Sequence, residues 1–140
     1  MPSVTKVKSG SIYEEKNSYS RMVIVDSHIF VSNTAGIDYK TRYISEDVGE
    51  QAQKALQNIE AALKAVGSSL GDVVRVITHV PDASGKDAVA AVLGEVFRGI
   101  DPASTMLCTP LTRPDLKVEF EVTAVKGVAE AAQERIKISI

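Results

Sequence analysis

One amphipathic segment in the middle of the chain constrains the fold most. Apolar residues recur at steps of three and four from Val48 to Val66, so a helix over this segment would carry a single apolar stripe. Ser45–Asp47 supplies a capping residue and two acids before it, and Gly67 follows where helices commonly end. A helix with one apolar side must pack on another layer, and the flanking segments indicate that this layer is a sheet.

Short runs rich in β-branched residues predict the strands, at residues 21–25, 28–32, 73–80, about 104–109 and about 117–125. The first two flank Asp26 and Ser27 and are typical of a hairpin. A second helix is expected from about Ser84 to Arg98, and Gly94 inside it indicates that another element packs closely there. The order β-β-α-β-α-β-β predicts one α+β domain over residues 1–140, with both helices on one face of a mixed sheet.

Charge, cysteine content and motifs exclude several classes of protein. The 16 basic and 18 acidic side chains give a net charge of −2, which disfavours nucleic-acid binding as a main function. Cys108 is the single cysteine, and we expect it to be a small buried hydrophobe. Neither His28 nor His79 has a partner at metal-ligand spacing, and no glycine-rich phosphate loop occurs, so neither a metal nor a cofactor is expected. The chain has no leader-like start and no apolar run of about 18 residues, so we expect a cytoplasmic protein without membrane contact.

The sheet face away from the helices is polar. Strand alternation puts Glu119 and Glu121 on that face, together with Arg75 and His79 of a neighbouring strand. Two carboxylates two residues apart on a strand repel each other unless a cation lies near, so we predict that Arg75 pairs with one of them, within or between subunits. Either water or another subunit covers this face. The residues alone predict an α+β domain that oligomerises.

Four segments, in this order, carry a family resemblance: Asn17–Ser20, Ala52–Ile59, Gly71–Val74 and Lys117–Glu121. With the order of elements, they resemble the reactive-intermediate deaminase (RidA/YjgF) family over about residues 3–126. The remaining residues, about 127–140, form a C-terminal extension in which the pattern of Ala129–Arg135 is compatible with a helix and Arg135–Ile140 alternates like a short strand. The resemblance implies a chorismate-mutase-like fold and a homotrimer with a central β-barrel, with small-molecule clefts between subunits.

The resemblance also implies an activity. Enzymes of this family hydrolyse 2-imino or enamine acids to 2-keto acids and ammonia, which requires a cation for the substrate carboxylate and a group that positions water. By resemblance Glu119 is the catalytic carboxylate, Tyr19 is the cleft tyrosine, and Ser32 and Asn33 occupy a cleft segment that usually reads Ser-Gly.

The same resemblance reveals a departure from the family pattern. Ser104 occupies the position of the carboxylate-binding arginine, and Met106 that of a usual cysteine. Serine cannot supply a charged hydrogen-bonding fork, so we expect weak activity on simple amino-acid imines unless another cation, with Arg113 the first candidate, binds the carboxylate. Three hypotheses remain: a divergent imine or enamine hydrolase, a non-catalytic regulatory trimer that binds a small molecule or protein, and, disfavoured by charge, a ribonuclease or translation inhibitor.

Overall fold

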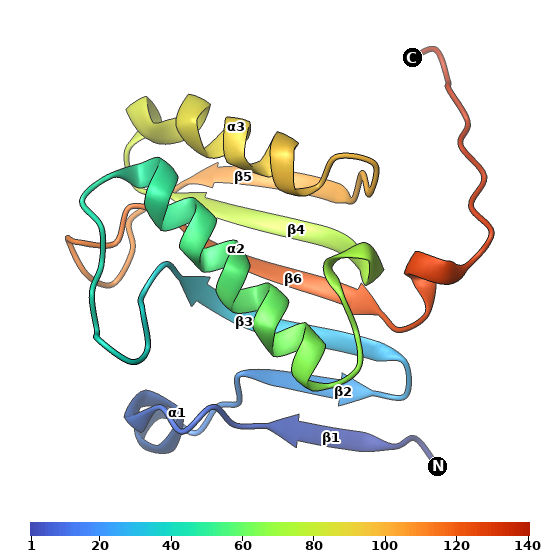
Figure 1. Ribbon diagram of the computed structural model, residues 1–140, viewed down its shortest axis with the longest axis horizontal. Helices are drawn as coiled ribbons and strands as arrows, with labels where there is room; N and C mark the ends of the chain where they lie inside the picture. Colours follow the sequence, from blue (N-terminus) through green and yellow to red (C-terminus); the bar gives the residue numbers. More distant parts are fainter.

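A six-stranded sheet forms one layer of the fold, and helices cover one of its faces (Figure 1). The computed structural model describes all of residues 1–140. Its elements, in chain order, are β1 (Val4–Val7), α1 (Ile12–Asn17), β2 (Met22–Val25), β3 (His28–Ala35), α2 (Val48–Ala65), β4 (Val73–Val80), α3 (Lys86–Val96), β5 (Ala103–Cys108) and β6 (Glu119–Val125). Short 3₁₀ turns lie at 70–72, 83–85 and 128–130.

The strand order is β1-β2-β3-β6-β4-β5. Only β4 and β5 run parallel, because α3 connects them as a crossover, and the other neighbours are antiparallel. The predicted α+β class and mixed sheet are therefore confirmed. β1 and β5 form the two edges of the sheet.

The long helix α2 carries the core on its sheet-facing side. Its stripe of Ala52, Ala55, Leu56, Ile59 and Leu63 is buried against inward side chains of the sheet. The carboxylate of Asp47 accepts a hydrogen bond from the Glu50 amide at 2.9 Å and caps the helix, and Gly67 at φ +80° follows its end. Both predicted boundaries of this helix are confirmed.

The sequence pattern missed β1 and α1. β1 is a four-residue edge strand with three exposed residues, so it has no buried face to create a period-two signal. α1 has six residues, too few for an apolar stripe, and its stability comes from local polar contacts. Ser11 caps it, and the buried carboxylate of Glu14 accepts hydrogen bonds from the amide and the hydroxyl of Ser9.

Three smaller expectations were wrong. A Cβ on Gly94 would meet nothing within 4 Å, so no element packs closely against that glycine. Cys108 is exposed, because β5 is the outermost strand and has no neighbour on one side. In the C-terminal extension, residues 128–130 form a 3₁₀ turn, and residues 132–140 form neither a helix nor a strand.

Two features fix the chain around the start of α2. A Cβ on Gly36 would lie 2.2 Å from the carbonyl oxygen of Gln51, so only glycine permits this approach. The buried Gln51 side chain donates hydrogen bonds to the carbonyls of Ser45 at 2.7 Å and Asp115 at 2.9 Å, and accepts one from the Lys117 amide at 2.9 Å. The loop that leads into β6 is therefore fastened to α2.

No helix of the fold has both the length and the apolar character needed to span a membrane.

Candidate functional site

A cavity of 490 Å³ lies where α1, the start of β2, the end of β3 and the start of β6 meet. These elements can be followed in Figure 1. We name it the Glu119 cavity. Three of the chain's four tyrosines line it, with three arginines and a single carboxylate. The lining side chains used below are Tyr13, Tyr19, Tyr39, Arg21, Arg42, Arg113, Asn33 and Glu119. The cavity is large enough for a small molecule and carries an excess of positive charge.

Glu119 is the first residue of β6 and pairs with Ala35 of β3 on one side and His79 of β4 on the other. As predicted from strand alternation, its side chain lies on the face away from the helices, since Phe120 next to it is fully buried. Burial raises the pKa of the Glu119 carboxyl, and the charges of His79 and Arg21 oppose this effect. A carboxyl with a raised pKa in a cavity can exchange protons closer to neutral pH than an exposed one.

Arg21 precedes β2 and is held at the cavity wall. Its Nη2 donates a hydrogen bond to the Asn33 carbonyl at 2.9 Å, and its Nη1 lies 3.4 Å from the Tyr39 hydroxyl. Its Nε is buried and has no hydrogen-bond partner in the chain. The guanidinium therefore keeps hydrogen-bonding capacity beyond its two contacts.

A bulge in β3 aims Asn33 across the sheet. The pairing of β3 with β6 shifts between Val31 and Thr34, so Ser32 and Asn33 are the bulged residues. The Asn33 Oδ1 lies 3.1 Å from Nδ1 of His79, whose Nε2 lies 3.6 Å from the Glu121 carboxylate. Ser32 does not line the cavity, and its hydroxyl donates instead to the Ser20 carbonyl at 2.7 Å.

This chain of contacts bears on the prediction that Arg75 neutralises a carboxylate. Within one chain the imidazole of His79, not Arg75, is the basic group within 4.0 Å of the Glu121 carboxylate, and the ion pairs of the structure do not include Arg75. Arg75 is paired with Thr123, two pairs away from Glu121 along the ladder. A contact of Arg75 between subunits stays a prediction.

Arg113 also lines the Glu119 cavity but is already paired. Its Nε and Nη2 donate to the two carboxylate oxygens of Asp115, at 3.0 and 2.5 Å. The hydrogen bonds to Asp115 raise the pKa of Arg113. This bidentate pair occupies the Nε–Nη2 edge of the guanidinium, one of the two edges through which it could bind a ligand carboxylate.

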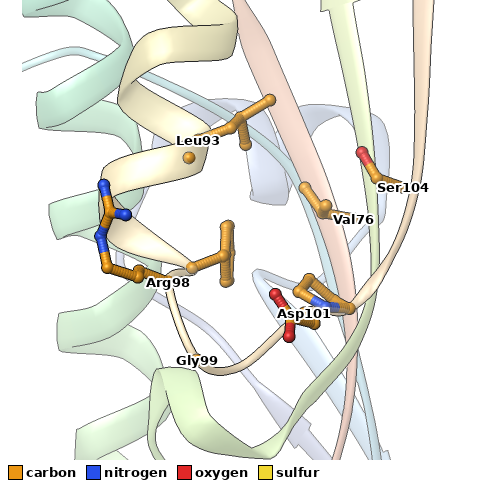
Figure 2. Close-up of a pocket in the computed structure, with 9 residues that line it drawn as sticks. Val76, Leu93, Arg98, Gly99, Asp101 and Ser104 are labelled. Atoms are coloured by element: carbon orange, nitrogen blue, oxygen red, sulfur yellow. The ribbon is translucent and has the colours of Figure 1, made fainter. Parts of the chain in front are cut away.

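Ser104 and Met106 lie elsewhere. They sit on the edge strand β5, paired with Val76 and Thr78 of β4, whose side chains are buried on the helix side of the sheet. Ser104 lines a second hollow of 360 Å³ between β5 and α3, with Leu93 and Asp101 (Figure 2). We name it the β5 hollow. One chain thus brings Glu119, Tyr19, Asn33 and Arg113 together, and leaves Ser104 and Met106 at another edge.

Sequence reasoning missed Arg21, Arg42, Tyr13 and Tyr39 as residues of the site. A signal for Arg21 was present, because it follows Tyr19 by two residues and precedes a buried strand position, Met22. Alternation would have placed it on the open face with Glu119. No cluster of three His, Cys, Asp or Glu side chains that could hold a metal ion occurs in the fold.

Comparison with known proteins explains this architecture. The model of the endoribonuclease L-PSP family matches residues 11–126. The chain belongs to this family. It is 34% identical to RutC family protein UK114 of Drosophila melanogaster, over 80% of this chain and 82% of that protein. It is 30% identical to the 2-iminobutanoate/2-iminopropanoate deaminase of Salmonella typhimurium, over 77% of this chain and 87% of that protein.

A solved structure confirms the fold of this family member. The crystal structure of Rv2704 from Mycobacterium tuberculosis, a member of the YjgF/YER057c/UK114 family, superimposes with a TM-score of 0.79 at 36% identity. The match covers 88% of this chain and 99% of that one. The resemblance to the RidA/YjgF family and the YjgF-like fold are confirmed.

Proposed function

We propose that this protein is a hydrolase of small 2-imino or enamine acids, with its reaction centre in the Glu119 cavity. One observation carries the proposal: a half-buried carboxyl with a raised pKa lies in a cavity whose other charged side chains are arginines. Several relatives are named 2-iminobutanoate/2-iminopropanoate deaminases, which supports this class of substrate.

The chemistry requires few groups. Water adds to the imine carbon, and the resulting carbinolamine then loses ammonia to leave a 2-keto acid. Glu119 accepts a hydrogen bond from the attacking water and takes its proton as the C–O bond forms. The same carboxyl returns this proton to nitrogen as the C–N bond breaks, and then takes the hydroxyl proton of the carbinolamine as the C=O bond forms, so that a protonated imine gives the 2-keto acid, ammonia and one proton. A raised pKa suits both steps, because the group must gain and lose a proton near neutral pH.

We further propose that the working unit is a homotrimer and that β5 of a neighbouring subunit closes the cavity. Tyr13, Tyr19 and Tyr39 are 47, 37 and 45% exposed in the single chain, and every residue of β5 is exposed. Contact between these surfaces would bring Ser104 and Met106 to the ligand. Sedimentation is expected to give three times the 15.0 kDa of the chain, and a monomer at micromolar concentration would contradict the trimer.

The proposed activity is tested by generating 2-iminobutanoate in solution and measuring 2-oxobutanoate and ammonia release above the buffer rate. Glu119→Gln should lower kcat/KM on the order of 10²- to 10⁴-fold. Glu121→Gln is the matched control, because it removes a charge two residues away, on the same face but outside the cavity lining. No acceleration by the wild type, or equal rates for the wild type and Glu119→Gln, would contradict the proposal.

The second candidate is a trimer that binds a small acid or a protein without turnover. The neutral Ser104 in place of the family arginine favours it. Ligand binding to the wild type without acceleration of hydrolysis would select this alternative. The ribonuclease hypothesis has less support, because the net charge of −2 offers no general attraction for a phosphate backbone.

A further inference from the structure

We propose that Arg21 binds the carboxylate of the ligand in the Glu119 cavity and thereby selects small 2-oxo and 2-imino acids over their neutral analogues. This inference uses the cavity of the proposed function. It replaces Arg113, the cation that the sequence suggested first.

The guanidinium of Arg21 is both fixed and incompletely paired. Its contacts with the Asn33 carbonyl and the Tyr39 hydroxyl hold its plane at the cavity wall. Those contacts use two donors, whereas a guanidinium carries five. Its Nε is buried without a partner in the chain, so a ligand in the cavity reaches the guanidinium through Nη1 and Nη2, each of which keeps one N–H without an acceptor. A ligand carboxylate supplies the acceptors that this guanidinium lacks.

The charge of Arg21 is not cancelled by its surroundings. No ion pair within 4.0 Å joins Arg21 to Glu119, although its charge acts on the Glu119 carboxyl. The two groups therefore line one cavity with space between them. A short acid can place its carboxylate on Arg21 while its C2 carbon lies beside Glu119.

The other cations of the cavity fit this task less well. Arg113 is held by both oxygens of Asp115, which offsets its charge. Arg42 belongs to the loop after β3 and is exposed, so its side chain loses more conformational freedom on binding a ligand. Arg21 is half-buried and already ordered by hydrogen bonds, which lowers the entropic cost of binding.

The remaining walls define the rest of the ligand. Tyr13, Tyr19 and Tyr39 present aromatic surface and hydroxyl groups, and Ala35, Ile37 and Leu116 add small apolar contacts. A cavity of 490 Å³ with these walls suits an acid with a short apolar or aromatic side chain.

The test measures binding by calorimetry with two probes, 2-oxobutanoate and the neutral 2-oxobutanamide. The wild type should prefer the acid, and Arg21→Met should weaken acid binding about 10- to 100-fold while leaving the amide nearly unchanged. Arg21→Lys should retain part of the preference, since it keeps the charge without the fork. Lys64→Met, which removes an exposed charge at the far end of α2, is the control and should bind like the wild type.

Two results would overturn the inference: an unchanged preference in Arg21→Met, or loss of the preference in Arg113→Met alone. If Arg21→Met fails to fold, Arg21→Lys decides, because a preference fully equal to that of the wild type would show that the fork plays no part. Failure of the proposed hydrolysis is distinguishable. Acid binding through Arg21 without turnover would leave the inference standing, whereas turnover with equal kcat/KM in the wild type and Arg21→Met would overturn the inference and leave the hydrolase standing.

Discussion

The Glu119 cavity and the β5 hollow differ in how many contacts hold their walls in place. At the cavity, a bulge, a glycine in contact with a helix backbone and a buried glutamine fix the surrounding elements. At the hollow, one wall is an edge strand with every residue exposed, and the helix wall contains Gly94 with open space beside it. The family resemblance assigns residues of both regions to one site, but one chain assembles only the first. In the proposed trimer, β5 of a neighbouring subunit would supply the rest of that site.

The largest expected effect is on the contact between β3 and α2 beside the Glu119 cavity. Gly36→Ala would place a Cβ 2.2 Å from the carbonyl oxygen of Gln51, so the end of β3 must move away from α2. We expect a loss of about 3 kcal/mol or more in the free energy of unfolding, measured by urea denaturation. A loss below about 1 kcal/mol would mean that this contact does not fix the cavity.

A smaller effect is expected at the edge strand. Ser104→Arg should raise hydrolysis of 2-aminoacrylate by up to about tenfold, because a second guanidinium enters the cleft from the neighbouring subunit. The double variant with Glu119→Ala should lose this gain. An unchanged rate in Ser104→Arg would indicate that β5 does not close the Glu119 cavity. The cavity and the β5 hollow would then lie apart in the oligomer as well as in the single chain.

In the β5 hollow we expect a stabilising change at Gly94 of α3. Gly94→Ala adds a methyl group where nothing lies within 4 Å, inside α3. Alanine is the better helix former, so the variant should gain about 0.5–1 kcal/mol in thermal or urea unfolding. A loss of stability would instead reveal that another copy packs against α3 at this glycine.

The smallest expected effect concerns the pH dependence of stability. Burial raises the pKa of folded Glu119 above its unfolded value, so the folded state loses stability as the pH rises from the ordinary carboxyl range through the folded pKa. Glu119→Gln removes this cost and should raise Tm on the order of 2 °C at pH 7. The gain should vanish at about pH 3, below the unfolded pKa, where the carboxyl is protonated in both states. A gain that is equal at both pH values would contradict the assigned cause.

The sequence predicted the elements whose burial leaves a period. The stripe of α2 and the alternation of β6 both follow from one-sided burial, and the position of Glu119 on the open face follows from the second pattern. β1 and α1 show no such period in their apolar residues. β1 is an exposed edge strand and α1 has only six residues, so each buries too few side chains. These elements carry or flank the walls of the cavity, so its outline was not predictable.

The site was predicted only in part for a topological reason. Residue type and family position pointed to Tyr19, Asn33, Arg113 and Glu119, which the fold brings together. The bulge that aims Asn33 and the Asp115 pairing that occupies Arg113 depend on tertiary structure. The separation of Ser104 depends on the parallel crossover through α3, which carries β5 to the sheet edge.

The most direct measurement of the central claim is a crystal structure of the protein soaked with 2-oxobutanoate. The account predicts density in the Glu119 cavity, with the carboxylate within hydrogen-bond distance of the Arg21 guanidinium and the C2 carbon beside the Glu119 carboxyl. Density confined to the β5 hollow near Ser104, or a carboxylate bound to Arg113 with Asp115 displaced, would contradict it.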